Sequence, residues 1–273
     1  MTLFKRKIKI LKIKKDIKEE IEDMVLYETP IDLYVNSEQI VNIICLAKDL
    51  KELSVGFLFS LGIINSISDI KDIIVNELEN FVKVDLNDNV DFNIEELDVN
   101  PVSRVIDTTC GISSPWRNTI KKSLDEAKVK EELKTKSNIR VKASMILSAI
   151  KKMQTSTPLY RETGGCHGAA IFDINGKLLS VKEDIGRHNA IDKVIGEILL
   201  KELNFDNVFL TSTGRLTGDS VLKALRARIP IVVSFSAAIE SGIRLAFAYG
   251  ITLIGFARGA RMNIYTHPQR IIT

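Results

Sequence analysis

The second half of the chain alternates short apolar runs with amphipathic segments, and this alternation restricts the fold more than any other feature. Val208–Thr211, Ile231–Phe235 and Thr252–Phe256 predict buried strands, while Gly218–Arg228 and Ala237–Tyr249 predict the helices between them. Strand–helix–strand order favours parallel strands joined by helical crossovers. The second half is therefore expected to be an α/β layered domain.

A predicted β-hairpin precedes these crossovers. Ala169–Ile174 and Lys177–Val181 flank Asn175-Gly176, a pair that favours a tight hairpin turn because both residues tolerate positive φ. Lys142–Met153 and residues 188–202 predict helices on either side of this hairpin.

The first half predicts a smaller α+β unit. Ile31–Val35 and Ile40–Leu46 are expected to be strands, Asp49 to cap a helix that ends at Leu61, and residues 71–77 and 81–86 to pair as two further strands. Residues 117–135 predict a polar helix.

Thr135–Asn138 is the predicted domain boundary. We expect an N-terminal α+β domain of residues 1–137, which carries Cys110, and an α/β domain of residues 138–273.

The composition is that of an ordinary globular protein. The chain has 273 residues, 45% of them hydrophobic and 27% charged, and its apolar runs are shorter than the ~20 residues that a membrane-spanning helix needs. The three cysteines have no regular spacing, which argues against a disulfide framework. These observations predict a cytoplasmic protein with reduced thiols that does not cross a membrane.

Positive charge is concentrated at the N-terminus. Residues 1–20 hold eight Lys and Arg against three Asp and Glu, a net charge of +5. A basic arm of this kind can bind nucleic acid. Lysines alternating with Ile8, Ile10 and Ile13 fit an edge strand better, so no nucleic-acid partner is expected.

Cys110 is the leading candidate for covalent chemistry. It lies in Asp107–Pro115, a stretch whose Gly, Ser and Pro predict an exposed loop. An accessible thiol reacts through its thiolate. Cys45 lies in an apolar run and is expected to pack as a small hydrophobe, whereas Cys166, between Gly165 and His167, keeps a possible role.

Polar and glycine-rich segments follow the three predicted parallel strands. They are Thr211–Asp219, Ser234–Ser236 and Gly255–Arg261, and Gly186-Arg187-His188 resembles them in composition. Ligands of open α/β sheets bind beyond the carboxyl ends of such strands, and helix N-termini and arginines there favour phosphate. We therefore expect a phosphate-bearing ligand, although none of the segments matches a known phosphate-binding fingerprint.

His167 and His188 are further candidate ligand contacts. His167 fits a base, a hydrogen-bond donor or a thiol partner, and Glu183-Asp184 with His188 form a polar cluster that loop capping also explains. A metal site built from Cys166, His167 and His188 is disfavoured, because the ligand spacings typical of zinc sites and of zinc deaminases are absent.

Four motifs together resemble one known family. They are Arg161–His167, Glu183–Ala190, Thr211–Arg215 and Phe256–Tyr265. In these motifs the chain is similar to the FdhD family of formate dehydrogenase accessory sulfurtransferases, and the resemblance extends from about Glu28 to Arg270.

The resemblance implies a cytidine-deaminase-like core that lacks the deaminase zinc. It also implies a persulfide carrier that takes sulfur from a cysteine desulfurase. The carrier passes it to the molybdenum (or tungsten) bis-molybdopterin guanine dinucleotide cofactor, before insertion into the formate dehydrogenase catalytic subunit. A homodimer is expected.

The same resemblance assigns residues. Cys110 matches the first cysteine of the family's Cys-x-x-Cys loop, while Ser113 stands where the second is expected. The implied cofactor-binding set is Phe256, Ala257, Arg258, Gly259, Ala260 and Arg261, with Thr213, Gly214, Arg215, Ser236, His167 and His188.

Two functions remain open at this stage. One is sulfur transfer through a persulfide on Cys110, and the other is a chaperone that binds the cofactor without covalent sulfur chemistry, which Ser113 keeps open. A nucleotide-processing enzyme on a deaminase-like scaffold is disfavoured by the missing zinc motif.

Overall fold

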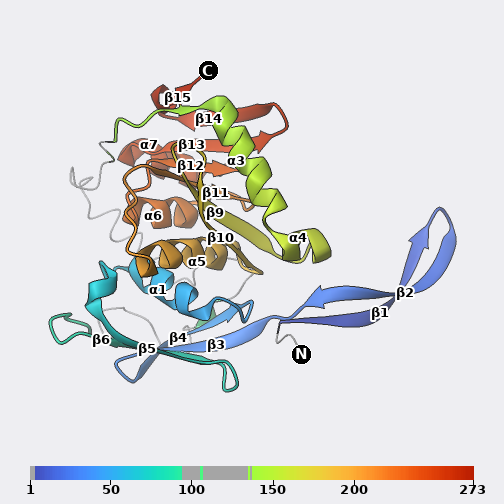
Figure 1. Ribbon diagram of the computed structural model, residues 1–273, viewed down its shortest axis with the longest axis horizontal. Coiled ribbons are helices and arrows are strands. Elements are labelled where there is room, and N and C mark those ends of the chain that lie inside the picture. Colours follow the sequence, from blue (N-terminus) through green and yellow to red (C-terminus); the bar gives the residue numbers. More distant parts are fainter. Residues whose placement is uncertain (1–3, 94–104, 107–134, 136) are drawn as a thin grey trace.

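The computed structural model describes residues 4–93, 105–106, 135 and 137–273, and its two largest sheets have helices between them (Figure 1). The larger, six-stranded sheet has the order β10-β9-β11-β12-β13-β14. Its strands are β9 (His167–Asp173), β10 (Leu178–Asp184), β11 (Val208–Ser212), β12 (Ile231–Ser234), β13 (Thr252–Arg258) and β14 (Arg261–Thr266).

The strand directions confirm the predicted crossovers and hairpin. β11, β12 and β13 are parallel neighbours, whereas β9 and β10 pair antiparallel and β9 also runs antiparallel to β11. The carboxyl ends of the three parallel strands therefore meet at one edge, where β9 begins.

Helices cover both faces of this sheet. Apolar side chains of α3 (Ala143–Thr155) pack on one face, and those of α5 (Arg187–Leu200), α6 (Gly218–Arg226) and α7 (Glu240–Tyr249) pack on the other. The short helix α4 (Pro158–Thr163) follows α3.

The predicted start of α7 at Ala237 is wrong, because the preceding residues pair with another loop. Leu216 N donates to Ala237 O and Ile239 N donates to Leu216 O, both at 2.9 Å. These bonds hold residues 237–239 extended, so the helix begins only at Glu240.

The first half forms the smaller sheet, with the order β5-β6-β3-β4-β7. Its elements are β3 (Thr29–Val35), β4 (Glu38–Cys45), α1 (Leu50–Leu61), β5 (Ile70–Asn76), β6 (Phe81–Leu86) and β7 (Val105–Ile106). α1 ends at Leu61, as predicted, and Gly62 follows it with φ 82°. Asp49 precedes α1 but makes no side-chain cap bond; its carboxylate instead accepts from Lys182 Nζ at 3.0 Å.

Helices α1 and α5 approach closely at two glycines. A Cβ atom at Gly56 would overlap the backbone oxygen of Asp192, and one at Gly196 would overlap that of Glu52. The contact joins apolar side chains of both sheets and of α1, α5, α6 and α7 in one core. The division into two domains at residue 137 stays an expectation.

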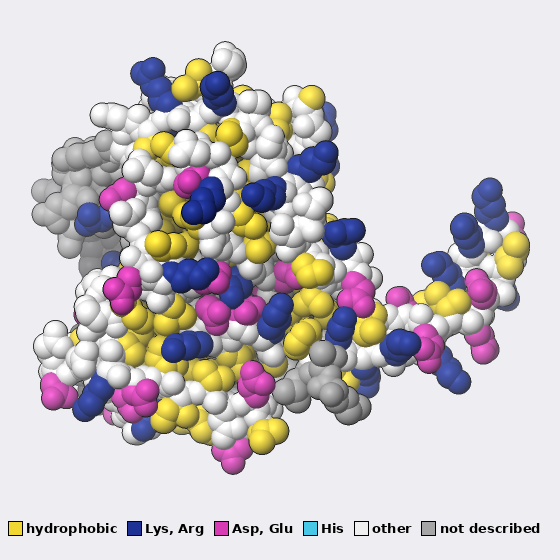
Figure 2. Space-filling model, in the orientation of Figure 1, with side chains coloured by type: hydrophobic (Ala, Val, Ile, Leu, Met, Phe, Trp, Pro, Cys, Tyr) yellow, Lys and Arg dark blue, Asp and Glu magenta, His cyan; other side chains and the backbone are white. Residues whose placement is uncertain are grey.

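An N-terminal hairpin projects from the body (Figure 1). β1 (Lys5–Lys14) and β2 (Ile17–Leu26) pair antiparallel, with Ile10 opposite Ile21. The predicted strand is confirmed, but its partner strand was missed. Figure 2 shows positive and negative side chains interspersed along this arm.

Four short elements complete the described chain. β8 (Val141–Lys142) pairs with β15 (Ile271–Ile272), and one-turn helices lie at Ile67–Asp69 and Pro268–Arg270. The predicted helix of residues 117–135 falls almost wholly outside the described residues. Within the described chain, every helix is too short or too polar to cross a membrane.

We predict that Gly196→Ala lowers the free energy of unfolding by about 1–3 kcal/mol, because the added methyl group must push α1 and α5 apart. Chemical denaturation monitored by circular dichroism measures this change. Lys151→Ala, on the exposed side of α3, is the control and should shift stability by no more than about 0.5 kcal/mol. Equal stability of the Gly196 variant and wild type would contradict the close contact.

Candidate functional site

The strand-end rim is the group of loops that follow β11, β12 and β13, together with the start of β9 and of α5. The parallel pairing brings Thr213, Ser236 and the segment from Phe256 to Arg261 to one edge. His167 joins them because β9 starts where β11 ends.

Thr213 fixes His167 at the rim. Its Oγ1 lies 3.1 Å from His167 Nδ1 and accepts from Gly168 N at 3.1 Å. Burial lowers the pKa of His167 below its usual 6.5, and the neighbouring Arg187 lowers it further. The ring is therefore neutral at pH 7, so the Thr213 hydroxyl can donate to Nδ1 and leave the proton on Nε2.

Two rim serines are structural. The Ser234 hydroxyl donates to Gly214 O at 2.6 Å, and its Oγ also lies 3.1 Å from Ser212 O. Ser212 Oγ accepts from Gly214 N at 3.1 Å. Both side chains are buried. The sequence placed them among the ligand-facing hydroxyls, but their bonds join the ends of β11 and β12 instead.

Gly214 and Arg187 are packed together. A Cβ atom at Gly214 would lie 2.8 Å from Arg187 Cβ, so the absence of a side chain lets the start of α5 approach the loop. Arg215, the next residue, is exposed, whereas His188 is buried.

β13 carries an unusual backbone conformation where its register with β14 shifts, between Gly255 and Arg258. Phe256 has φ 51°, and its N–H donates to Ser236 O at 2.8 Å. A bulky residue in this left-handed region is strained by about 1–3 kcal/mol, a feature that concentrates at functional sites. Ala257 points into the core, so only its backbone is available to a ligand.

Arg258 is the last residue of β13 and lies against two aromatic rings. Its guanidinium carbon is 5.6 Å from the ring centre of Phe235 and 5.7 Å from that of Phe256, within the range of cation–π attraction. Arg258, Gly259, Ala260 and Arg261 are all exposed. Phe235 was not among the predicted site residues, although it lies between the two rim serines Ser234 and Ser236.

The Glu183-Asp184 pair caps helices, as the alternative interpretation expected. Glu183 accepts from Leu159 N and Tyr160 N at the start of α4, at 3.2 and 2.7 Å. Asp184 accepts from Gly186 N at 2.8 Å, just before α5.

Cys45 and Cys166 are both buried. Burial raises the pKa of Cys166 to about 12, helped by Glu183, whose Oε1 lies 3.8 Å from the sulfur. Burial likewise raises the pKa of Cys45. Neither thiol ionises near pH 7, and the described residues bring together no group of three or more His, Cys, Asp or Glu that could hold a metal ion. Cys110 and Ser113 lie outside the described residues.

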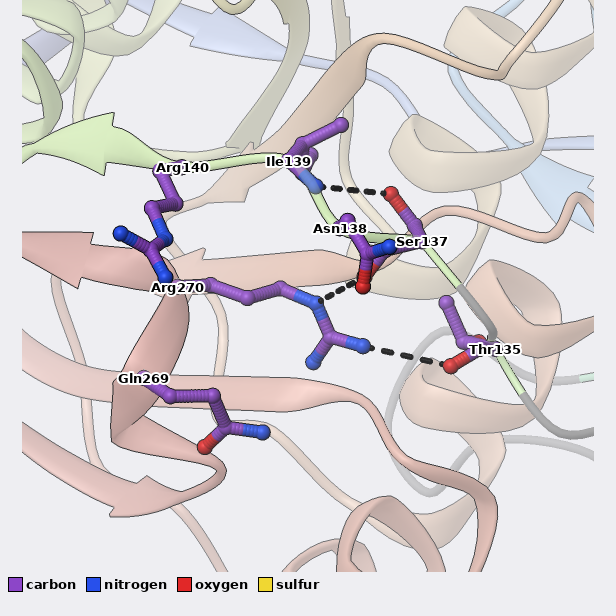
Figure 3. Close-up of a pocket in the computed structure, with 7 residues that line it drawn as sticks. All are labelled: Thr135, Ser137, Asn138, Ile139, Arg140, Gln269 and Arg270. Atoms are coloured by element: carbon purple, nitrogen blue, oxygen red, sulfur yellow. Dashed lines mark hydrogen bonds between the residues drawn. The ribbon is translucent and has the colours of Figure 1, made fainter.

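A pocket of about 230 Å³ lies at the opposite end of the sheet (Figure 3). Arg270 Nε and Nη2 donate to the backbone oxygens of Ser137 and Thr135 at 3.1 and 3.2 Å, and Nη1 donates to Gly250 O at 2.8 Å. Arg270 is therefore structural rather than part of the rim.

Comparison with known proteins identifies the relatives of this chain. A family model described as FdhD/NarQ matches residues 26–272. The chain belongs to the FdhD/NarQ family. The match includes both sheets and the entire rim, and it leaves out nearly all of the β1–β2 arm.

Individual FdhD proteins align over most of their length. The chain is 35% identical to the sulfur carrier protein FdhD of Sulfolobus acidocaldarius, covering 97% of this chain and 98% of that protein. It is 34% identical to that of Bacillus subtilis, over 92% of each chain. A crystal structure described as a formate dehydrogenase accessory protein from Desulfotalea psychrophila has a TM-score of 0.76 and 28% identity, covering 98% of this chain and 100% of that one.

We predict that Arg258→Ala and Arg261→Ala each weaken GDP binding by about 1.5–3 kcal/mol, the range for hydrogen bonds to charged groups. Titration calorimetry measures the effect, with Arg244→Ala on the exposed face of α7 as the control. Equal affinity for GDP and guanosine would contradict a phosphate site. Equal affinity for GDP and ADP would leave the phosphate site but remove its guanine preference.

We also predict that iodoacetamide at pH 8 leaves Cys45 and Cys166 of the folded protein unmodified, because both are buried thiols with raised pKa values. Peptide mass spectrometry gives the extent of labelling, and both should react fully in guanidinium chloride. Rapid labelling of Cys166 in the folded state would contradict its placement beside Glu183.

Proposed function

We propose that this chain is a sulfur carrier that forms a persulfide on Cys110 and serves formate dehydrogenase maturation. The observation that carries the proposal is the burial of Cys45 and Cys166. Of the three cysteines, this burial leaves Cys110 to accept sulfur. Relatives that align over nearly the whole chain are named sulfur carrier proteins.

The donor in this proposal is a cysteine desulfurase that holds a persulfide. The Cys110 thiolate attacks the outer sulfur, the S–S bond of the donor breaks, and the donor cysteine leaves as a thiolate. The new S–S bond then lies on Cys110. Incorporation of that sulfur as sulfide takes two electrons, which two external thiols supply as they become a disulfide, because Ser113 replaces a second loop cysteine.

The acceptor in this proposal is the molybdenum (or tungsten) bis-molybdopterin guanine dinucleotide cofactor, bound as a substrate at the strand-end rim. Its phosphates suit the exposed guanidinium groups of Arg215, Arg258 and Arg261. The neutral His167 presents an N–H donor to the same ligand. A cytidine-deaminase-like layering, a cytoplasmic location and a homodimer belong to the same proposal.

A non-covalent cofactor chaperone is the second candidate, because Ser113 removes one of the two thiols expected in the loop. Mass spectrometry separates the two functions. After incubation with a cysteine desulfurase and cysteine, an adduct of about 32 Da, one sulfur atom, is expected on Cys110. Its absence would favour the chaperone.

We predict that Cys110→Ser abolishes maturation of a co-expressed formate dehydrogenase, because a hydroxyl group cannot form a persulfide. The melting temperature and the GDP affinity should stay at their wild-type values, which shows that the loss is chemical. A fully active dehydrogenase made with this variant would overturn the covalent mechanism.

A further inference from the structure

Three buried side chains join the end of β4 to the start of α5. Asn189 Nδ2 donates to Ile44 O at 3.0 Å, Leu46 N donates to Asp184 Oδ2 at 3.1 Å, and Lys193 Nζ donates to Leu46 O at 3.1 Å. We call Asp184, Asn189 and Lys193 the β4 clamp. It holds three backbone groups of two residues, Ile44 in β4 and Leu46 just after it.

The clamp is a fully paired polar network. Lys193 Nζ lies 2.6 Å from Asp184 Oδ2, and both side chains are 0% exposed. The second carboxylate oxygen accepts from Gly186 N and from Asn189 Nδ2 at 2.8 and 3.0 Å. Because each buried charge has its partners, the network has one favourable arrangement, and it makes the joint between β4 and α5 rigid.

β4 in turn sets the register of β7. The two strands are parallel, with Val105 opposite Asn42 and Ile106 opposite Ile43. The described chain thus leaves β7 in the direction of Ile44 and Leu46, where the clamp lies. Cys110 follows Ile106 by four residues in the sequence, and a chain of four residues can reach at most about 14 Å in any conformation.

The other side of the same segment belongs to the rim. Arg187 and His188 lie between Asp184 and Asn189, and the Arg187 side chain packs against Gly214. One short stretch of chain therefore contacts both the candidate ligand site and the end of β4, the strand that pairs with β7.

We propose that Asp184, Asn189 and Lys193 are positioning residues, which hold β7 at a fixed place relative to the rim so that sulfur can pass between them. The inference rests on the proposed function. It adds that sulfur delivery depends on the joint between β4 and α5. Persulfide loading involves only the β7 side of this joint and nucleotide binding only the rim side, so neither should depend on it.

The test compares Asn189→Ala with Ser60→Ala. Both remove one side-chain partner of a buried carboxylate. The Ser60 hydroxyl donates to Asp192 Oδ1 at 2.7 Å, a bond between α1 and α5 that does not involve the β4 clamp. We expect Asn189→Ala to slow sulfur delivery by about 10- to 100-fold, the cost of a misplacement of roughly 1 Å. Persulfide loading of Cys110 and the affinity for GDP should stay within about twofold of wild type. A twofold change in affinity corresponds to about 0.4 kcal/mol of binding free energy. Ser60→Ala should leave all three unchanged.

Hydrogen exchange supplies a readout that does not depend on sulfur chemistry. Asn189→Ala should speed amide exchange in β4 and β7 but not in β11. Ser60→Ala should leave amide exchange in all three strands at the wild-type rate. Delivery at the wild-type rate, or equal losses in both variants, would overturn the positioning role. If wild type forms no persulfide while the exchange result holds, the proposed function fails and the mechanical coupling of β7 to α5 stands.

Discussion

The close approach of α1 and α5 is the contact on which the rest of the architecture depends. Gly56 and Gly196 let the two helix backbones touch, and apolar side chains from both sheets then share one core. Charged side chains whose burial without a partner would cost free energy lie beside this contact. Asp192 pairs with Lys223 at 2.7 Å and also accepts from Ser60. Separation of α1 from α5 would take the Ser60 hydroxyl away from Asp192, whereas the pair with Lys223 joins α5 to α6.

The larger sheet was predicted well because its signals are local. Apolar runs of strand length, Asn175-Gly176 and Gly250 specify the hairpin, the crossovers and one helix end. The β2 strand was missed because Glu19, Glu20 and Glu22 lower its strand propensity. Only its pairing with β1, seen in the structure, identifies it as a strand.

The site was predicted in its outline but not in its detail. The predicted strand order placed Thr213, Ser236 and Arg258 at one edge, yet Ser212 and Ser234 hold loops together rather than face solvent. Sequence alone gives no rule for such bonds. It also gave no sign of the β4 clamp, because two of the clamp's hydrogen bonds join residues that are separated by 138 and by 147 positions in the sequence.

The N-terminal arm has a consequence for behaviour in concentrated solution. A ribbon of two strands exposes unpaired backbone N–H and C=O groups along both outer edges, and such edges can recruit further strands into fibres. On β1, lysines at positions 7, 9, 12 and 14 separate the apolar residues. Addition of a second β1 strand alongside would bring ammonium groups together, and this repulsion opposes fibre growth while the edge stays open.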